Sequence, residues 1–153
     1  MKIPTLMLVA AALGVNGCAT VRTPAGPITL TSANKAPYGS YVVDAGGRAL
    51  YILEGTRGAP GTNRCSGPCL QIWPPLGATA PQVVGGRLSQ RLVSVVPGYG
   101  GPQVAYAGWP LYYYHHDRVP SDTTGQHVTD SWGTWHLLSP SGQPIRPAGS
   151  PGY

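Results

Sequence analysis

Apolar positions beyond the N-terminus fall in short runs that are separated by glycine and proline. Runs 41–44 and 49–53 flank Ala45-Gly46-Gly47, a pattern typical of a β-hairpin. Further short strands are predicted at 70–73, the second half of 87–96, 103–106, 111–115, 134–138 and 143–145. Short strands at this spacing predict an all-β protein, specifically a small compact antiparallel domain.

The N-terminus has a different pattern, with Lys2 followed by an apolar run over 3–15 that ends in small residues. This order predicts a signal peptide over 1–17. Val15-Asn16-Gly17-Cys18 resembles a bacterial lipobox, although Asn16 departs from the usual small residue at its position. Lipidation of Cys18 is therefore predicted, with palmitate among the acyl chains. The alternative is cleavage after Ala10-Ala11-Ala12, which leaves Cys18 as an ordinary thiol.

A lipidated cysteine carrying more than one acyl chain anchors a protein stably to a membrane. The sequence after Cys18 contains no apolar run long enough to span a bilayer. We therefore expect a membrane partner through the lipid and a location in the cell envelope, facing the periplasm or the exterior. In a Gram-negative host, Ala19 after the lipidated cysteine favours the outer membrane.

Beyond the signal peptide, the sequence divides into a polar tether over 18–37, a β domain over 38–145 and a loose tail over 146–153. The domain contains two degenerate repeats, 38–80 and 103–145, joined by a connector over 81–102. Both repeats contain Gly-x-x-Leu-Tyr, with the glycine at 47 and 108, and each has a later tryptophan, Trp73 or Trp135. Each repeat is too small to be stable alone, so we expect the two halves to share one core.

Composition refines this picture. The chain has 22 Gly and 17 Pro among 153 residues, which is about twice average usage. Only 10% of the residues are charged while 42% are hydrophobic, which excludes a solvated disordered chain. No stretch beyond the signal peptide that lacks both Gly and Pro exceeds ten residues. Long helices are therefore not expected.

The second repeat contains Tyr112-Tyr113-Tyr114-His115-His116-Asp117, which is similar to the Tyr-x-(Phe/Trp/Tyr)-x-x-Asp motif of the bacterial "secreted repeat of unknown function" lipoproteins. The repeated Gly-x-x-Leu-Tyr and the Trp73-Pro74-Pro75-Leu76 segment resemble the same family. This resemblance implies exported lipoproteins with paired repeats and supplies no catalytic residue. It makes Tyr112, Tyr114 and Asp117 a candidate ligand site, and the alternative is that this motif is structural. The first repeat departs from the motif, with Leu53 and Thr56 at the corresponding positions.

Cys65 and Cys69 remain as a pair if Cys18 carries lipid. In an oxidising compartment, the expected state is a structural disulfide across the Gly67-Pro68 turn. The alternative is a redox-active dithiol, which three intervening residues make less favourable.

All four histidines, His115, His116, His127 and His136, lie in the second repeat. Together with Asp117 they are candidate ligands for zinc or copper. The alternative is that these histidines are surface or hydrogen-bonding residues that bind no metal. We expect this alternative, and therefore no cofactor. The aromatic residues of this repeat are expected mainly in the core, with an exposed subset able to stack on a flat ligand.

No pattern typical of nucleophilic, carboxylate-pair or phosphate-loop catalysis is present in the sequence. The positive charges are scattered, which together with export predicts no nucleic-acid partner. The sequence thus favours a non-enzymatic binding or envelope-associated module with an unknown protein or small-molecule partner. The alternative function is a periplasmic metal-binding or redox-associated protein.

Overall fold

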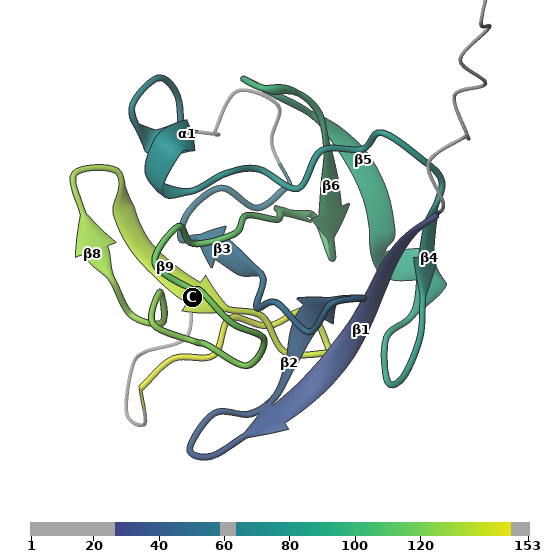
Figure 1. Cartoon of the computed structure of the whole chain (residues 1–153). Coiled ribbons are helices and arrows are strands. Elements are labelled where there is room, and N and C mark those ends of the chain that lie inside the picture. The colour runs from purple at the N-terminus through teal and green to yellow at the C-terminus, as the bar shows by residue number, and fades with distance from the viewer. Residues whose placement is uncertain (1–26, 59–63, 148–153) are drawn as a thin grey trace, which may run out of the picture.

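The structure is a computed structural model that describes residues 27–58 and 64–147, so the predicted signal peptide and Cys18 lie outside the described residues (Figure 1). Its strands and helices are, in chain order, β1 (Ile28–Lys35), β2 (Gly39–Asp44), β3 (Tyr51–Leu53), α1 (Cys69–Ile72), β4 (Gln82–Val84), the 3-10 turn η1 (Gln90–Leu92), β5 (Val93–Gly98), β6 (Gly101–Tyr106), β7 (Trp109–Pro110), β8 (Thr129–Asp130) and β9 (Gly133–Leu137). The prediction of a compact all-β protein without a long helix is confirmed for these residues. Within them, no helix is both long and apolar enough to cross a membrane.

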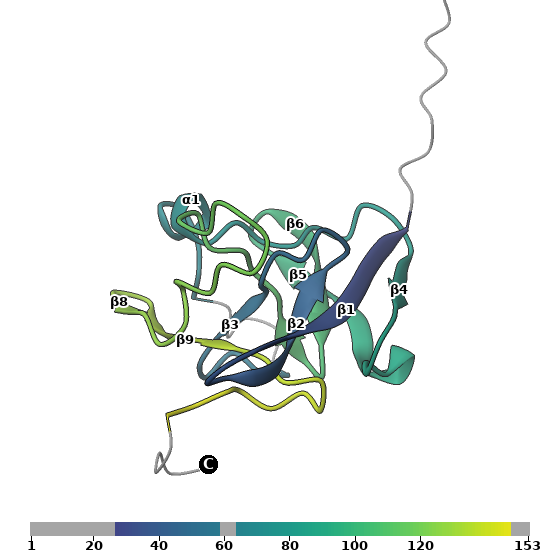
Figure 2. The same ribbon diagram turned by 60° about the horizontal axis from the view of Figure 1, so that its bottom comes forward.

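The strands form three small sheets, ordered β2-β1-β4, β3-β9-β8 and β5-β6-β7. The pairs are antiparallel except for β1 and β4, which run parallel. Isolated bridges tie segments outside the strands to the sheets, including Tyr112 to Tyr51 of β3 and Gly77 to Gln103 of β6. Figures 1 and 2 show the three sheets arranged around a common interior, with α1 at one end.

The interior contains two hydrophobic clusters, one on each face of the segment 49–53. Ala49, Tyr51 and Leu53 belong to one cluster, whereas Leu50 and Ile52 belong to the other. Successive side chains of a strand point to opposite faces, which explains this alternation. Each cluster also contains residues of the second repeat, so the halves share two cores rather than the single core expected.

Matching turns in the two repeats depend on glycine. Gly47 and Gly108 have φ angles of +79° and +81°, a left-handed conformation that glycine adopts without steric penalty. The chain therefore turns at equivalent points before Leu50-Tyr51 and Leu111-Tyr112. The two tyrosines then pair through both backbone hydrogen bonds, at 2.8 and 2.9 Å.

Three of the predicted strands have another structure, and the last of them, 143–145, contributes only an isolated bridge at Pro144. Residues 69–72 form the short helix α1, which begins after Pro68 in a helical conformation (φ −59°, ψ −27°). A segment of four residues that is apolar except for Gln71 is too short to distinguish a strand from a helical turn. The segment 111–115 contributes only isolated bridges at Tyr112, because the chain turns at His115 and His116.

The predicted tether over 18–37 is wrong for its last part. Strand β1 pairs with β2 over six residues and with β4 over three, and its Leu30 is fully buried. Backbone pairing holds this polar strand although few of its side chains enter the core. The connector over 81–102 contains β4, which the sequence did not predict, and β5, which corresponds to the strand predicted in the second half of 87–96. In the predicted loose tail, Arg146 is held by an ion pair with Glu54 at 2.8 Å, and residues 148–153 lie outside the described range.

Candidate functional site

The Tyr-x-Tyr-x-x-Asp motif builds a buried hydrogen-bond network. Asp117 is 9% exposed, and its Oδ2 accepts a hydrogen bond of 2.7 Å from the Tyr51 hydroxyl. Its Oδ1 accepts from the backbone N–H and the hydroxyl of Thr124, at 2.9 and 2.6 Å. Burial, and then the hydrogen bond to Asp117, raise the pKa of the Tyr51 hydroxyl well above its usual value. The aspartate of the second repeat thus binds the tyrosine of the first.

A glycine makes this network possible. A Cβ atom at Gly125 would lie 2.9 Å from the Tyr51 ring and 3.0 Å from the Tyr114 ring. The backbone N–H of Gly125 donates to the Tyr51 hydroxyl at 3.3 Å. Tyr114, which the sequence grouped with Tyr112 and Asp117, packs at the edge of Tyr51 and stacks on Trp73 at 4.3 Å. The three motif residues are therefore engaged in the packing and bonding of the interior.

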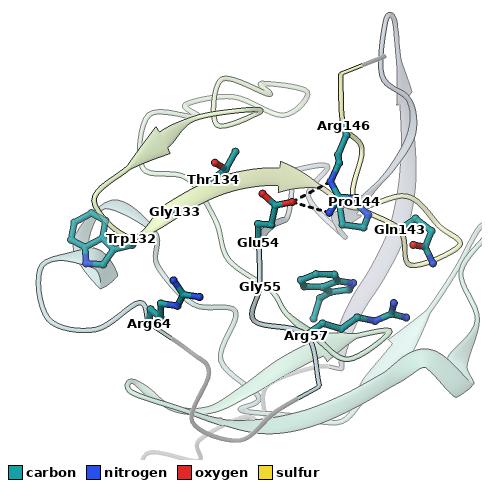
Figure 3. A pocket seen from close by; sticks show the side chains of 11 residues that line it. Glu54, Gly55, Arg57, Arg64, Trp132, Gly133, Thr134, Gln143, Pro144 and Arg146 are labelled. Carbon is teal, nitrogen blue, oxygen red and sulfur yellow. Dashed lines mark hydrogen bonds and ion pairs between the residues drawn. The ribbon is translucent and has the colours of Figure 1, made fainter. Parts of the chain in front are cut away.

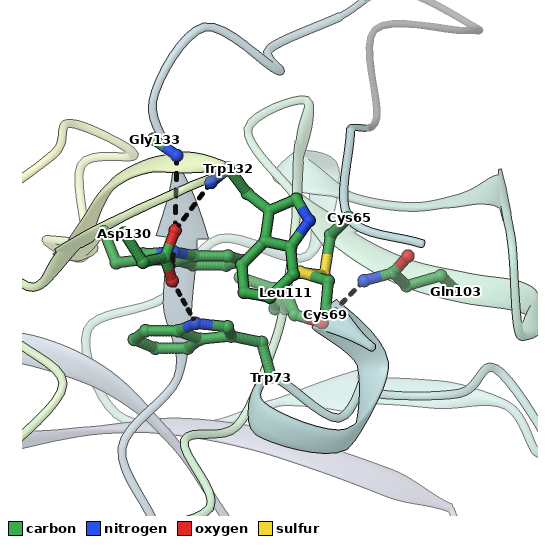
Figure 4. The surroundings of a disulfide bond; sticks show 9 residues. Cys65, Cys69, Trp73, Gln103, Leu111, Asp130, Trp132 and Gly133 are labelled. Carbon is green, nitrogen blue, oxygen red and sulfur yellow. Dashed lines mark hydrogen bonds between the residues drawn. A yellow bond between two sulfur atoms is a disulfide. The ribbon is translucent and has the colours of Figure 1, made fainter. Parts of the chain in front are cut away.

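The equivalent tryptophans of the two repeats lie against each other. The rings of Trp73 and Trp135 stack at 3.9 Å with an interplanar angle of 9°. Both indole N–H groups donate to Asp130 Oδ2, at 2.8 and 3.0 Å. Asp130 Oδ1 accepts from the backbone N–H of Trp132 at 2.9 Å, as Figure 4 shows. One carboxylate therefore ties both repeats together.

The predicted disulfide is confirmed. Cys65 and Cys69 are bonded to each other, with Cα atoms 5.1 Å apart (Figure 4). Both residues are fully buried in the cluster that contains Trp73. Gly67 between them has a φ angle of +54°, as a tight turn requires. The bond closes the loop before α1.

The four histidines lie in two pairs. The rings of His115 and His116 are 3.6 Å apart beside Tyr114, whereas His127 and His136 are 5.4 Å apart. Among the described residues, no group of three or more His, Cys, Asp or Glu side chains is arranged to hold a metal ion. The structure therefore does not bring the four histidines and Asp117 to one site. The Asp117 carboxylate is instead hydrogen-bonded to Tyr51 and Thr124.

His136 is the most buried of the four, with 3% exposure. Its Nε2 lies 3.7 Å from Glu54 Oε2, beyond hydrogen-bond distance, and neither ring nitrogen has a hydrogen-bond partner. Burial lowers the pKa of this imidazole below its usual value, while the nearby Glu54 carboxylate opposes the shift. The ring is thus favoured in its neutral form.

Glu54 also lines an open cavity of about 550 Å³, shown in Figure 3. Three arginines, Arg57, Arg64 and Arg146, contribute to its wall together with Trp109 and Trp132. The remaining lining residues are Gly55, Gly133, Thr134, Gln143 and Pro144. We call this site the arginine cavity.

The three arginines differ in their bonding. Arg146 is paired with Glu54 through Nε and Nη2, at 3.2 and 2.8 Å. Arg57 donates from Nε to the Ala107 carbonyl at 3.1 Å, and its guanidinium lies 5.7 Å from the Trp109 ring centre. Arg64 has neither a hydrogen bond nor an ion pair to any residue in the described part of the chain. Two cationic groups therefore face the cavity without a counterion.

Comparison with known families gives a match that begins in the predicted connector and covers most of the predicted second repeat. Residues 93–139 match the family described as a secreted repeat of unknown function. The resemblance inferred from the sequence is confirmed over these residues, and it supports an extracytoplasmic protein. No curated protein and no solved structure matches the chain.

The matched range extends from β5 to the residue after Leu138 and includes Tyr112, Asp117 and Trp135. The partners of these residues, Tyr51 and Trp73, precede the matched range. The matched repeat therefore completes its interior with side chains of the preceding half of the chain.

The arginine cavity was missed by the sequence reasoning. Arg57 and Arg64 stand seven positions apart, in no motif, and Arg146 was assigned to the tail. Scarcity of acidic residues was the only available signal, because five carboxylate side chains cannot pair with ten basic ones. That signal does not say which arginines meet in the fold.

Proposed function

We propose that this protein is a lipid-anchored extracytoplasmic binding protein, without enzymatic activity, that holds a small molecule in the arginine cavity. The observation that carries the proposal is the cavity itself. It combines a volume of about 550 Å³ with aromatic walls and cationic groups. Small-molecule sites are typically concave, partly apolar and of this size range.

The bonding of the other polar groups supports a binding role over catalysis. The carboxylates of Asp117 and Asp130 are occupied by hydrogen bonds from tyrosine, threonine and tryptophan side chains. Cys65 and Cys69 are joined in a disulfide, so neither is a free nucleophile. A general base or nucleophile needs an accessible reactive atom, and these groups have none to offer.

The binding role is tested by filling the cavity. Gln143 is exposed at its wall, so Gln143→Trp is expected to occupy the space without disturbing the core. The matched control is Ser141→Trp, an exposed position nearby that does not line the cavity. Thermal unfolding of the full chain is measured against a panel of anionic, neutral and cationic small molecules. We expect at least one compound to stabilise the parent and Ser141→Trp but not Gln143→Trp. Equal responses of all three proteins would overturn the proposed binding role.

The anchor is tested separately at Cys18. We expect Cys18→Ala to move the protein from the membrane fraction to the soluble fraction, and intact mass to show acyl chains on the parent only. The same fractionation separates inner from outer membrane and checks the role proposed for Ala19. A mature chain that begins at Leu13 with an unmodified Cys18 contradicts the anchor and leaves the binding test unaffected.

A further inference from the structure

We infer that the arginine cavity is an oxyanion site, which takes a small ligand bearing a carboxylate, phosphate or sulfate group at Arg64 and Arg57. This inference rests on the proposed binding function and names the chemical class of its ligand.

The first argument concerns the supply of counterions. The chain has five acidic side chains, and all five lie in the described residues. The four aspartates accept hydrogen bonds at other places in the fold. Asp44 accepts from Gly46, Arg48 and Tyr113, and Asp117 accepts from Tyr51 and Thr124. Asp122 accepts from Arg118 and Val119, and Asp130 accepts from Trp73, Trp132, Gly133 and Trp135. Glu54 is paired with Arg146. No carboxylate side chain is left for Arg57 or Arg64.

The second argument is that the two cations share a concave wall. Arg57 and Arg64 are exposed, as are Arg87 and Arg91, but only the first two line a described cavity. Around the arginine cavity, three guanidinium groups face one carboxylate, which leaves an excess of two positive charges. Low-dielectric walls that carry one sign of charge concentrate the field and attract ions of the other sign.

The third argument is preorganisation. Nε of Arg57 is fixed on the Ala107 carbonyl, and its guanidinium lies over Trp109. The backbone of the same segment is tied by a hydrogen bond of 2.9 Å from the Gly58 N–H to the Gly108 carbonyl. The terminal nitrogens of Arg57 therefore stay available as donors on an anchored side chain. Guanidinium groups bind carboxylate and phosphate oxygens in a two-bonded geometry that ammonium groups lack.

The tryptophans add a second feature to the ligand. Trp132 is half-buried at the cavity, and Trp109 is 6% exposed in its wall. The indole N–H of Trp109 has no acceptor within the described part of the chain. An aromatic wall suits a ligand that carries a ring beside its anionic group. A carboxylated sugar has this chemistry.

The test uses isothermal titration of the full chain in detergent at low ionic strength, where surface screening is weakest. The probes are glucuronate, inorganic phosphate and inorganic sulfate, with glucose as the neutral match of glucuronate. The variants are Arg64→Gln and Arg57→Gln, and the matched control is the exposed Arg91→Gln. We expect at least one oxyanion to bind more tightly than glucose. Each cavity variant should weaken it by about tenfold or more, the range of a charge-assisted hydrogen bond, and Arg91→Gln should leave it unchanged.

The probes also separate the two sources of the oxyanion. Preference for glucuronate over phosphate and sulfate identifies a carboxylate ligand, and the reverse identifies a phosphate or sulfate ligand. Equal losses in Arg91→Gln and Arg64→Gln overturn the inference, because general surface charge then explains the binding. Binding of glucose equal to that of glucuronate, or no binding of any oxyanion, also overturns it. The binding role itself stands or falls by the Gln143→Trp comparison.

Discussion

Asp117 is buried and Asp130 half-buried, with hydrogen-bond donors at both oxygens of each carboxylate, whereas Arg57 and Arg64 line a cavity without a counterion among the described residues. Buried polar groups are stable only when they are satisfied, so the first region is suited to holding the fold together. Cations left open at a cavity do little for the fold and are available to a ligand. The difference indicates that the conspicuous sequence motif is structural, and that the binding chemistry lies in residues outside it.

The largest expected effect is at Asp130. Its replacement by alanine leaves the indole N–H groups of Trp73 and Trp135 without an acceptor. Each buried donor without an acceptor lowers the free energy of unfolding by about 1–3 kcal/mol. We therefore expect Asp130→Ala to lower the free energy of unfolding by about 4 kcal/mol, measured by urea denaturation with tryptophan fluorescence. The control is Asp122→Ala, because that carboxylate binds only backbone N–H groups in an exposed turn. A smaller loss for Asp130→Ala than for Asp122→Ala would refute the structural role of the shared carboxylate.

The next effect is at the contact between repeats. Tyr51→Phe removes the hydroxyl that donates to Asp117, and Asp117→Asn removes the charged acceptor. We expect each change to lower the free energy of unfolding by about 2 kcal/mol, with the double variant well below their sum because both break one bond. Denaturation of the four proteins measures this coupling. Tyr113→Phe, whose hydroxyl bonds half-exposed Asp44, is the control and should lose less. Additive losses would show that Tyr51 and Asp117 do not act together.

The sequence predicted features that depend on local chemistry. Glycines 47 and 108 marked the equivalent turns, and the spacing of Cys65 and Cys69 indicated the disulfide that the structure contains. The apolar run over 49–53 beside the Gly46-Gly47 turn predicted a strand, though not that both of its faces would be buried. These features follow from properties of a few adjacent residues, so a single sequence suffices for them.

Contacts between distant residues were beyond such reasoning. The motif suggested a site formed by Tyr112 and Asp117, yet Asp117 bonds Tyr51, 66 positions earlier. The four histidines are close in sequence, but the turn at His115 and His116 separates that pair from His127 and His136. Arg57 and Arg64 line the same cavity only because the turn after β3, the start of β9 and the 143–146 segment form its other walls. Pairing between segments decides these outcomes, and residue spacing does not encode it.

His136 lies between the two regions, in the interior but close to Glu54 of the arginine cavity. Burial lowers its pKa in the folded state, so the folded protein resists protonation while the unfolded chain accepts it near pH 6.5. The stability present above about pH 6.5 should therefore fall as the pH decreases, by at most about 1.4 kcal/mol per pH unit. Urea denaturation at several pH values measures this slope.

Two variants decide whether His136 causes that slope. His136→Gln should flatten the acid-side loss, because the titrating group is gone. Glu54→Gln should steepen it, since the Glu54 carboxylate opposes the effect of burial on the His136 pKa. If the parent and His136→Gln lose stability in parallel as the pH falls, the interior does not disfavour the charged imidazole.

The smallest expected effect is at Arg64, and it decides the comparison. Its guanidinium has no hydrogen bond or ion pair in the described part of the chain, so Arg64→Gln should change the free energy of unfolding by less than about 0.5 kcal/mol. Arg146→Gln is the matched control in the same cavity, and the loss of its pair with Glu54 should lower stability by up to about 1 kcal/mol. Urea denaturation measures both. A loss at Arg64 as large as that at Arg146 would make it a structural cation, and the contrast between a satisfied interior and an open arginine cavity would fail. Unchanged stability together with weakened oxyanion binding is the combination that only a ligand-directed arginine produces.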